Sequence, residues 1–301
     1  MKYAATIVLG LVSVLSVAQG SIDIFTGSFR HGFKANAEDL SGDAYENMTL
    51  VNLKFPIVFS ESTIWYNDLT YQSPVVHYSD DFSNAIRPTR LYGFLFQTGL
   101  VQRLTETTAV QLLMMPRFMT DFKGVGLQHF QFGGIGLFEK KYHDRFMMRY
   151  GLLYNRELFG HVFVPLVYVD WKLSDKWSVT GLLPIFSKIS YQVTDNLSFG
   201  FNHFGLVTSY QLGDAAYNND YIERKSIDVT LFGRIRIAGN FHFETRAGYA
   251  LGRSYRQYEE GDELDFKIIT FSFGDDRVQK NIAFDPGPIL DFRIVYNLPL
   301  D

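Results

Sequence analysis

An all-β fold, a transmembrane antiparallel up-and-down β-barrel, is predicted by three observations. Apolar and polar residues alternate one by one in stretches that recur from residue 90 almost to the end, with short polar turns between them. Aromatic residues make up 16% of the chain, which fits the aromatic girdles of membrane barrels. The mean hydropathy of -0.04 excludes a bundle of membrane helices. A period of two gives each strand one apolar face, which in such a barrel contacts lipid.

Residues 1–18 are predicted to be a cleaved signal peptide. Lys2 supplies a positive start, Ala4 to Val17 is an apolar stretch too short for a membrane span, and Ser16 and Ala18 fit a small-residue cleavage site. The mature chain would then begin at Gln19, and an uncleaved anchor helix is the alternative. Export followed by a barrel predicts the bacterial outer membrane as the location.

Residues 19–46 are polar and mixed, and we expect them to form a periplasmic N-terminal segment before a barrel at 47–301. The first strand is predicted at about 47–60, where Val51, Leu53 and Phe55 share one face and Pro56 bends the strand. Residues 61–88 contain prolines and paired aspartates, which indicates a long external loop with room for one further hairpin.

Eleven further strands follow at regular spacing. They are predicted at 90–104, 108–122, 128–142, 145–158, 162–173, two short strands within 177–194, 197–212, 228–238, 241–255 and 288–299. A slip in phase near His203 indicates a β-bulge. Residues 257–287 are expected to form a large external loop, with Lys267–Phe273 as a strand extension. The total is about twelve strands, and ten or fourteen fit the same pattern.

A soluble barrel of the lipocalin type is the alternative architecture, because alternating strands also build periplasmic barrels and sandwiches. The abundance of aromatic residues and the size of a single sheet of this length favour the membrane barrel. Tight turns at one rim and long loops at the other are typical of outer-membrane barrels.

Charged residues on the polar faces are the candidate functional residues, because these faces are predicted to line the lumen. Two interpretations are open: the charges select solutes in a narrow pore, or they pair across strands and fill the barrel. Arg234, Arg236, Glu244 and Arg246 lie on strands joined by a tight turn and predict a local ion-pair cluster. The lumen-facing candidates are Arg103, Arg117, Arg149, Asp170, Lys172, Arg234, Arg236, Glu244, Arg246, Asp291 and Arg293.

The sequence gives little support for disulfides, metal sites, catalysis or nucleic-acid binding. The chain has no cysteine, which excludes disulfides and thiolate metal sites, and its seven histidines are scattered without metal-ligand spacing. His77-Tyr78-Ser79 has the spacing of a barrel lipid hydrolase but falls in a predicted loop. We therefore expect no cofactor, no metal and no catalytic residues, and hence no enzyme. A net charge of -4 without a basic tail gives no sign of nucleic-acid binding.

In several short sequence elements the chain resembles the uncharacterised outer-membrane β-barrel proteins found widely in Gram-negative bacteria. They are the turns Ser174-Asp175-Lys176-Trp177 and Thr194-Asp195-Asn196-Leu197, the Leu183-Pro184 and Ile189-Ser190-Tyr191 elements, and an amphipathic last strand. The resemblance covers about residues 47–300 and implies outer-membrane lipid and the barrel-insertion machinery as partners. The chain departs from it by ending on Asp301, with Tyr296 as its last aromatic residue. Two functions are open: a porin-like narrow pore or transporter for a small solute, or a structural barrel whose external loops bind a partner.

Overall fold

The computed structural model describes residues 21–37, 40–78, 90–281 and 286–299. Fourteen antiparallel strands close into a barrel, and three short strands, β2, β17 and β18, lie outside the closed sheet. Within these ranges, helical structure is confined to the single turns Leu127–His129 and Ala215–Tyr217. The predicted signal peptide lies outside the described residues. None of the helices in the described ranges is long and apolar enough to cross a membrane.

The barrel opens with a strand in the segment predicted to be periplasmic. β1 (Ser21–Gly32) pairs with β3 (Leu40–Lys54) on one side and with the last strand, β19 (Gly287–Pro299), on the other. The pairing of β1 with β19 closes the sheet. The prediction of a separate segment at 19–46 is therefore wrong where the structure describes it. Its outer face carries Gly27 and His31 beside Phe25 and Phe29, which left too little apolar alternation to reveal the strand.

The predicted external loop at 61–88 is also mostly a strand. β5 (Thr63–Tyr78) pairs with β3 and β6 along its length, and residues 79–89 lie outside the described residues. The predicted break at Pro56 is present, since β3 ends at Lys54 and β4 (Ile57–Ser60) continues its line. Pro116 divides β7 (Thr108–Met114) from β8 (Arg117–Thr120) in the same way. Two strands added at the start of the chain raise the count from twelve to fourteen.

The remaining wall follows the predicted strands, with some ends extended. Along the chain these are β6 (Tyr92–Thr105), β9 (Phe130–His143), β10 (Phe146–Glu157), β11 (Gly160–Lys172), β12 (Trp177–Leu183), β13 (Phe186–Thr194), β14 (Leu197–Gln211), β15 (Tyr221–Ala238) and β16 (Phe241–Tyr258). The predicted bulge at His203 is absent, because β14 pairs with β15 without a register shift from Leu197 to Gln211. The apolar–polar alternation of β14 is lost near the end of the strand because three consecutive residues, Thr208, Ser209 and Tyr210, are all buried there.

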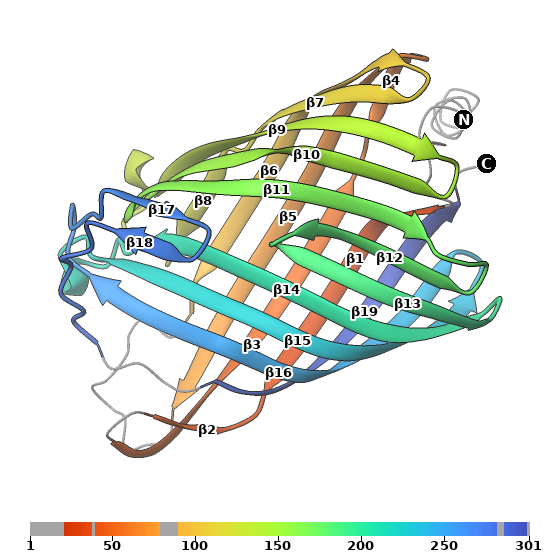
Figure 1. Cartoon of the computed structure of the whole chain (residues 1–301). Helices are drawn as coiled ribbons and strands as arrows, with labels where there is room; N and C mark the ends of the chain where they lie inside the picture. Colours follow the sequence, from red (N-terminus) through yellow and green to blue (C-terminus); the bar gives the residue numbers. More distant parts are fainter. Residues whose placement is uncertain (1–20, 38–39, 79–89, 282–285, 300–301) are drawn as a thin grey trace, which may run out of the picture.

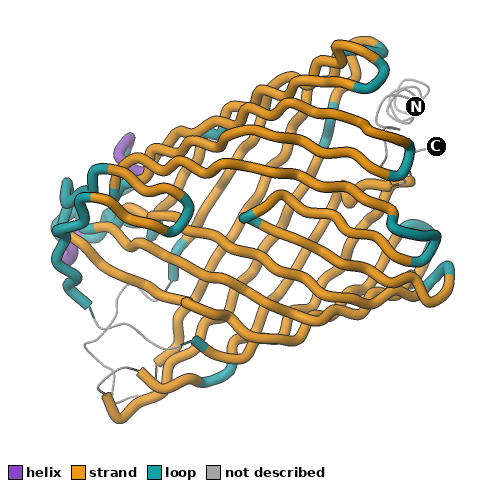
Figure 2. Tube along the Cα trace, viewed as in Figure 1, coloured by secondary structure: helices purple, strands orange, loops and turns teal. Residues whose placement is uncertain are grey.

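Connections differ between the two rims. Figure 2 shows tight turns along the rim near both termini and longer connections at the opposite rim. We call these the turn rim and the loop rim. The loop rim carries β2 (Ala35–Ala37) and the hairpin of β17 (Phe266–Ile268) and β18 (Phe271–Phe273), in which β17 pairs in parallel with the start of β11. The predicted strand extension at Lys267–Phe273 is thus this external hairpin.

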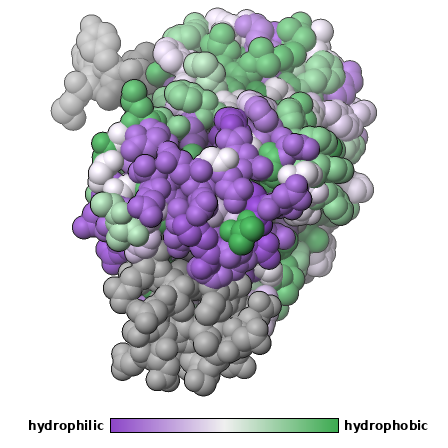
Figure 3. Space-filling view, turned by 90° about the vertical axis from the view of Figure 1, so that its left-hand side faces the viewer, coloured by the Kyte–Doolittle hydropathy of each residue, from purple (hydrophilic) through white to green (hydrophobic). Residues whose placement is uncertain are grey.

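The outer surface of the wall is apolar. Side chains that alternate with buried ones stay highly exposed, for example Leu112 at 63%, Phe132 at 63% and Leu231 at 68%. Figure 3, which looks at the loop rim, shows hydrophilic residues over that end and hydrophobic residues along the flanks. A water-soluble barrel would turn its polar face outward, so the sheet is inverted with respect to a soluble fold.

The wall is irregular at the β12–β13 hairpin, which is much shorter than its neighbours (Figure 1). β12 pairs with β11 only from Val167 onward, and β13 pairs with β14 only up to Phe204. Nearer the loop rim, the described edges of β11 and β14 are not paired with each other. We call this interruption the seam.

Beyond the seam, the end of β14 lies inside the barrel wall. The inward side chain of Gln131 donates to the Ser209 carbonyl, 3.0 Å, and Gln211 bridges to Thr120 of β8. Ser209 also donates through its hydroxyl to the Glu157 carboxylate at the end of β10, 2.7 Å. The sheet therefore overlaps itself, with β14 against the inner face of strands β8 to β11.

Candidate functional site

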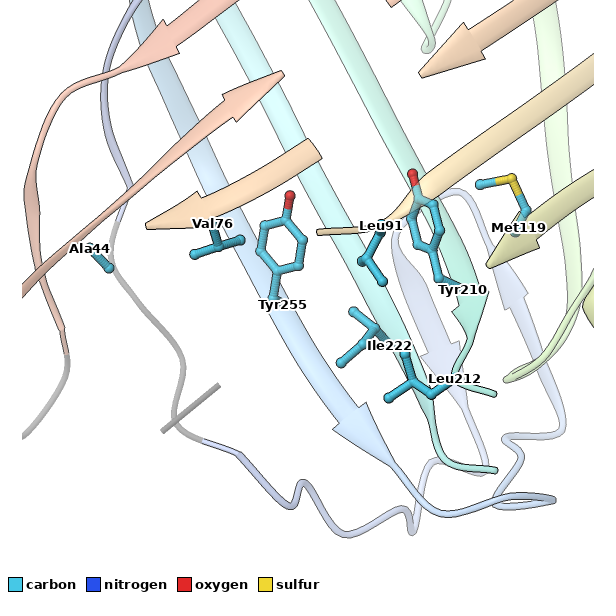
Figure 4. Close-up of a cluster of buried hydrophobic side chains, with 8 residues drawn as sticks. All are labelled: Ala44, Val76, Leu91, Met119, Tyr210, Leu212, Ile222 and Tyr255. Carbon is cyan, nitrogen blue, oxygen red and sulfur yellow. The ribbon is translucent and has the colours of Figure 1, made fainter. Parts of the chain in front are cut away.

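The lumen near the loop rim is filled by side chains from across the barrel. Figure 4 shows a cluster of buried apolar and aromatic residues from β3, β5, β8, β14, β15 and β16, together with Leu91, which lies just before β6. Tyr210 and Met119 are 0% exposed, and Tyr255 is 2% exposed. Side chains that lined a water-filled pore would be wetted, so the lumen is closed at this level.

An ionic network centred on Glu46 lies beside this cluster. The Glu46 side chain is 0% exposed and accepts from the Arg224 guanidinium at 2.9 Å, and also from Arg30 and the Tyr255 hydroxyl. Arg30 pairs in addition with Asp228. Its members come from four strands, with Arg224 and Asp228 both on β15, so the network ties β1, β3, β15 and β16 together. We call Glu46, Arg30, Arg224, Asp228 and Tyr255 the plug network.

A second network lies nearer the turn rim and is centred on Glu244. Its carboxylate, 1% exposed, contacts Arg246 at 2.7 Å, Lys188 at 2.9 Å and Arg293 at 2.9 Å, with Arg234 at 3.8 Å. The four cations come from β13, β15, β16 and β19, and they surround the one acid. Arg234 also pairs with Asp23 of β1 at 2.7 Å.

The two networks differ in their access to water. The four cations around Glu244 keep 12–18% of their side-chain surface exposed. In the plug network, the Arg224 and Glu46 side chains keep 2% and 0%. Because both networks face inward, the lumen is packed less tightly around Glu244 than at the plug. We call the lumen around Glu244 the vestibule, and the plug network closes it at its loop end.

The predicted lumen-facing residues are distributed over several places. Arg234, Glu244, Arg246 and Arg293 meet in the second network, and Asp291 stands opposite Arg246 in register. Arg149 pairs with Glu139 at 2.7 Å, and Arg117 with Glu157 at 2.7 Å. Asp170 is buried, Arg103 is half-buried, and Lys172 and Arg236 are exposed near the turn rim, away from the cluster. The predicted cluster is therefore present without Arg236.

Sequence reasoning missed the plug network and Lys188. Arg30 and Glu46 lie in the segment predicted to be periplasmic, and Arg224 lies in the part of β15 before the predicted start at residue 228. A signal was available for Lys188, since it alternates with Ile189 on a predicted short strand.

Features of an active site are sparse. Within the described ranges, no group of three or more metal-ligating side chains is positioned to hold a metal ion. The candidate triplet at residues 77–79 is only partly visible: His77 hydrogen-bonds Asn47 at 3.3 Å and stacks on Tyr45, while Ser79 lies outside the described residues.

Comparisons with known proteins gave a family match and similarities to solved structures. The family model described as "Domain of unknown function (DUF6268)" matches residues 76–267. A search of curated proteins gave no match. Among solved structures, the COG4313 outer membrane channel from Pseudomonas putida F1 is 11% identical, with 94% of this chain and 98% of that chain covered and a TM-score of 0.45. The P. putida toluene transporter TodX is 9% identical, with 96% and 92% covered and a TM-score of 0.42. These are similarities of overall shape.

Proposed function

Because the chain belongs to the DUF6268 family of domains of unknown function, whose name assigns no activity, we propose a function from the barrel itself. The protein is a bacterial outer-membrane transporter for a small solute, with a lumen that is closed at the loop end until the plug network rearranges. The observation that carries this proposal is the charged vestibule, whose cations keep accessible surface, below a plug whose side chains keep almost none.

The membrane location is supported by the exposed apolar flank and tested by one substitution. Leu231→Arg places a charge on the outer face, where lipid contact would cost about 2–4 kcal/mol at the bilayer midplane. We expect a loss of that order in the free energy of unfolding in lipid vesicles. Arg at an exposed site of a water-soluble barrel would change stability by less than about 0.5 kcal/mol, and that result would argue against a membrane barrel.

Transport is tested by conductance in planar lipid bilayers. We expect the wild-type protein to be mostly closed and Glu46→Gln to conduct. The Glu46 carboxylate pairs with both Arg30 and Arg224, and without it the two cations repel each other and the plug opens. Glu263→Gln is the matched control, since Glu263 pairs with Arg156 at 2.6 Å on the loop-rim surface, with 39% of its side chain exposed. It should behave as the wild type.

The alternative function is a structural barrel without an open channel, and the filled loop end favours it. That alternative gains support if neither the wild type nor Glu46→Gln conducts while the protein is folded. Folding is checked by the shift in gel mobility on heating, which membrane barrels show when they unfold.

A further inference from the structure

Part of the lumen wall is apolar, in contrast to the charged networks elsewhere. Leu113, Ile135, Leu153 and Val164 are cross-strand neighbours on four successive strands, and they form one inward row. Leu137 and Leu166 flank Gly151 in the next row. Leu113, Ile135, Leu137, Leu153 and Leu166 are only 2–7% exposed. A lumen that carried only polar solutes would have no use for such a patch, because water-filled barrel interiors are polar.

The patch ends at the seam. Its last strand is β11, whose edge toward β14 loses β12 as its ladder partner before Val167 and is paired again only at His161–Phe163, by β17. The tip of the β12–β13 hairpin covers it there, since Ile185 and Leu182 pack against the patch together with Tyr66. Ile185 is held to β14 by one backbone hydrogen bond, in which the Gly205 N–H donates to its carbonyl, 2.7 Å.

A second buried apolar cluster continues the patch toward the loop rim. Val164 packs both against the lumen patch and against a cluster that contains Phe159, Val162 and Leu264, with Val207 of β14 at its edge. Val164 points inward from β11 and Val207 points outward from β14, so the two lie where the overlapping layers meet. Apolar side chains therefore run without interruption from the lumen, through the seam, to the base of the β17–β18 hairpin.

The external hairpin covers the outer end of this track. β17 pairs with only His161, Val162 and Phe163 of β11. Lys267 points inward to Glu223, 2.9 Å, whereas Phe271 and Phe273 are 69% and 44% exposed. Backbone hydrogen bonds from Leu264 to Phe159 and from Ile269 to Phe163, each 3.0 Å, also hold the hairpin, and the Lys267 ammonium lies 4.4 Å from the centre of the Phe159 ring. Apart from the three residues of β11, the hairpin strands pair only with each other among the described residues, so opening the hairpin leaves the fourteen-stranded wall intact.

We propose that a small, uncharged apolar molecule passes through the barrel wall at the seam, between the lumen and the outer leaflet of the membrane. This rests on the proposed function and adds the route and the chemical class of the solute. Ile185 is the inner cover of the route and the β17–β18 hairpin is the outer one. An apolar solute gains nothing from the hydrated mouth of a pore, and a side exit into lipid keeps it away from water throughout.

The test measures entry of the apolar dye 1-N-phenylnaphthylamine into cells that carry the protein in the outer membrane, where lipopolysaccharide slows spontaneous entry. We expect Ile185→Ala to accelerate entry about tenfold, equivalent to about 1.4 kcal/mol off the barrier. Ile189→Ala is the matched control, because Ile189 lies on the same hairpin, is 38% exposed on the outer face, and should leave entry unchanged.

A blocking variant tests the same route in the other direction. Val164→Phe adds bulk to the junction of the two clusters and should slow entry about tenfold. Val169→Phe on the outer face of β11 is its control. If Val164→Phe fails to fold, as judged by gel mobility, Ile185→Ala decides the question alone.

The outcomes separate this inference from the proposed function. Dye entry above that of cells without the protein, but equal in all four variants, would overturn the seam route and leave transport standing. Conductance in bilayers without any dye entry would have the same meaning. Neither conductance nor dye entry would overturn both. Entry that follows Ile185 and Val164 supports both.

Discussion

Removing the one acid at the centre of the second network is expected to destabilise the barrel strongly. Glu244→Gln keeps the shape of the side chain but leaves Lys188, Arg246 and Arg293 close together without their shared carboxylate, while Arg234 keeps Asp23. Breaking a buried ion pair by removing one partner costs about 3–5 kcal/mol. Because the cations retain 12–18% exposure, water recovers part of the loss, and we expect about 3 kcal/mol.

The assay is equilibrium unfolding by urea in lipid vesicles, followed by tryptophan fluorescence. Glu139→Gln is the control, because Glu139 serves a single cation, Arg149, and its side chain is 13% exposed. The double variant Glu244→Gln with Lys188→Met should recover part of the loss, since it removes one of the repelling charges. A loss below about 1 kcal/mol for Glu244→Gln, the value for exposed pairs, would refute the claim that Glu244 is a buried acid shared by these cations.

Two further outcomes are expected. Gly151→Ala should prevent correct folding, because a Cβ there would lie 1.8 Å from the Gly136 carbonyl oxygen, whereas Gly233→Ala has nothing within 4 Å and should fold normally; gel mobility after refolding into detergent distinguishes them. At the loop rim, the Arg277 guanidinium that donates to Asp275 lowers the pKa of that carboxyl. The contact therefore contributes stability above the unfolded pKa of about 3.9 and loses it as pH falls through the folded pKa. The protection of residues 271–280 from hydrogen exchange, measured relative to the intrinsic exchange rate at each pH, should fall below about pH 4. Constant protection, or the same fall in Asp275→Asn, would contradict this.

The alternation of residues was sufficient to predict most of the wall, because lipid outside and water or charge inside impose opposite demands on successive side chains. It failed where that contrast is weak. β1 places Gly27 and His31 on its outer face, and β5 carries Asn67, Asp68 and Pro74 within the strand. A proline removes only one ladder hydrogen bond, so the neighbouring pairs keep Pro74 in register with Met48.

The ionic networks were harder to predict from the sequence than the strands. Alternation assigns a charged residue to the inner face but does not say which distant strand it meets. Arg234 and Glu244 could be placed together because a tight turn sets their register. Arg224 and Glu46 are 178 positions apart, and their contact depends on how the closed barrel folds inward at the loop rim.

The short β12–β13 hairpin provides one cause for both unusual features of the barrel. Had its strands reached the loop rim, they would have held β14 in the wall by ladder hydrogen bonds on both edges. With that support missing above Phe204, the end of β14 is free to turn inward and pack against β8 and β9. The same displacement carries Tyr210 and Thr208 into the lumen, where Tyr210 accepts from Gln72 at 2.8 Å and closes the mouth. The plug and the seam are therefore coupled, and restoring the missing wall should open the mouth while it closes the side.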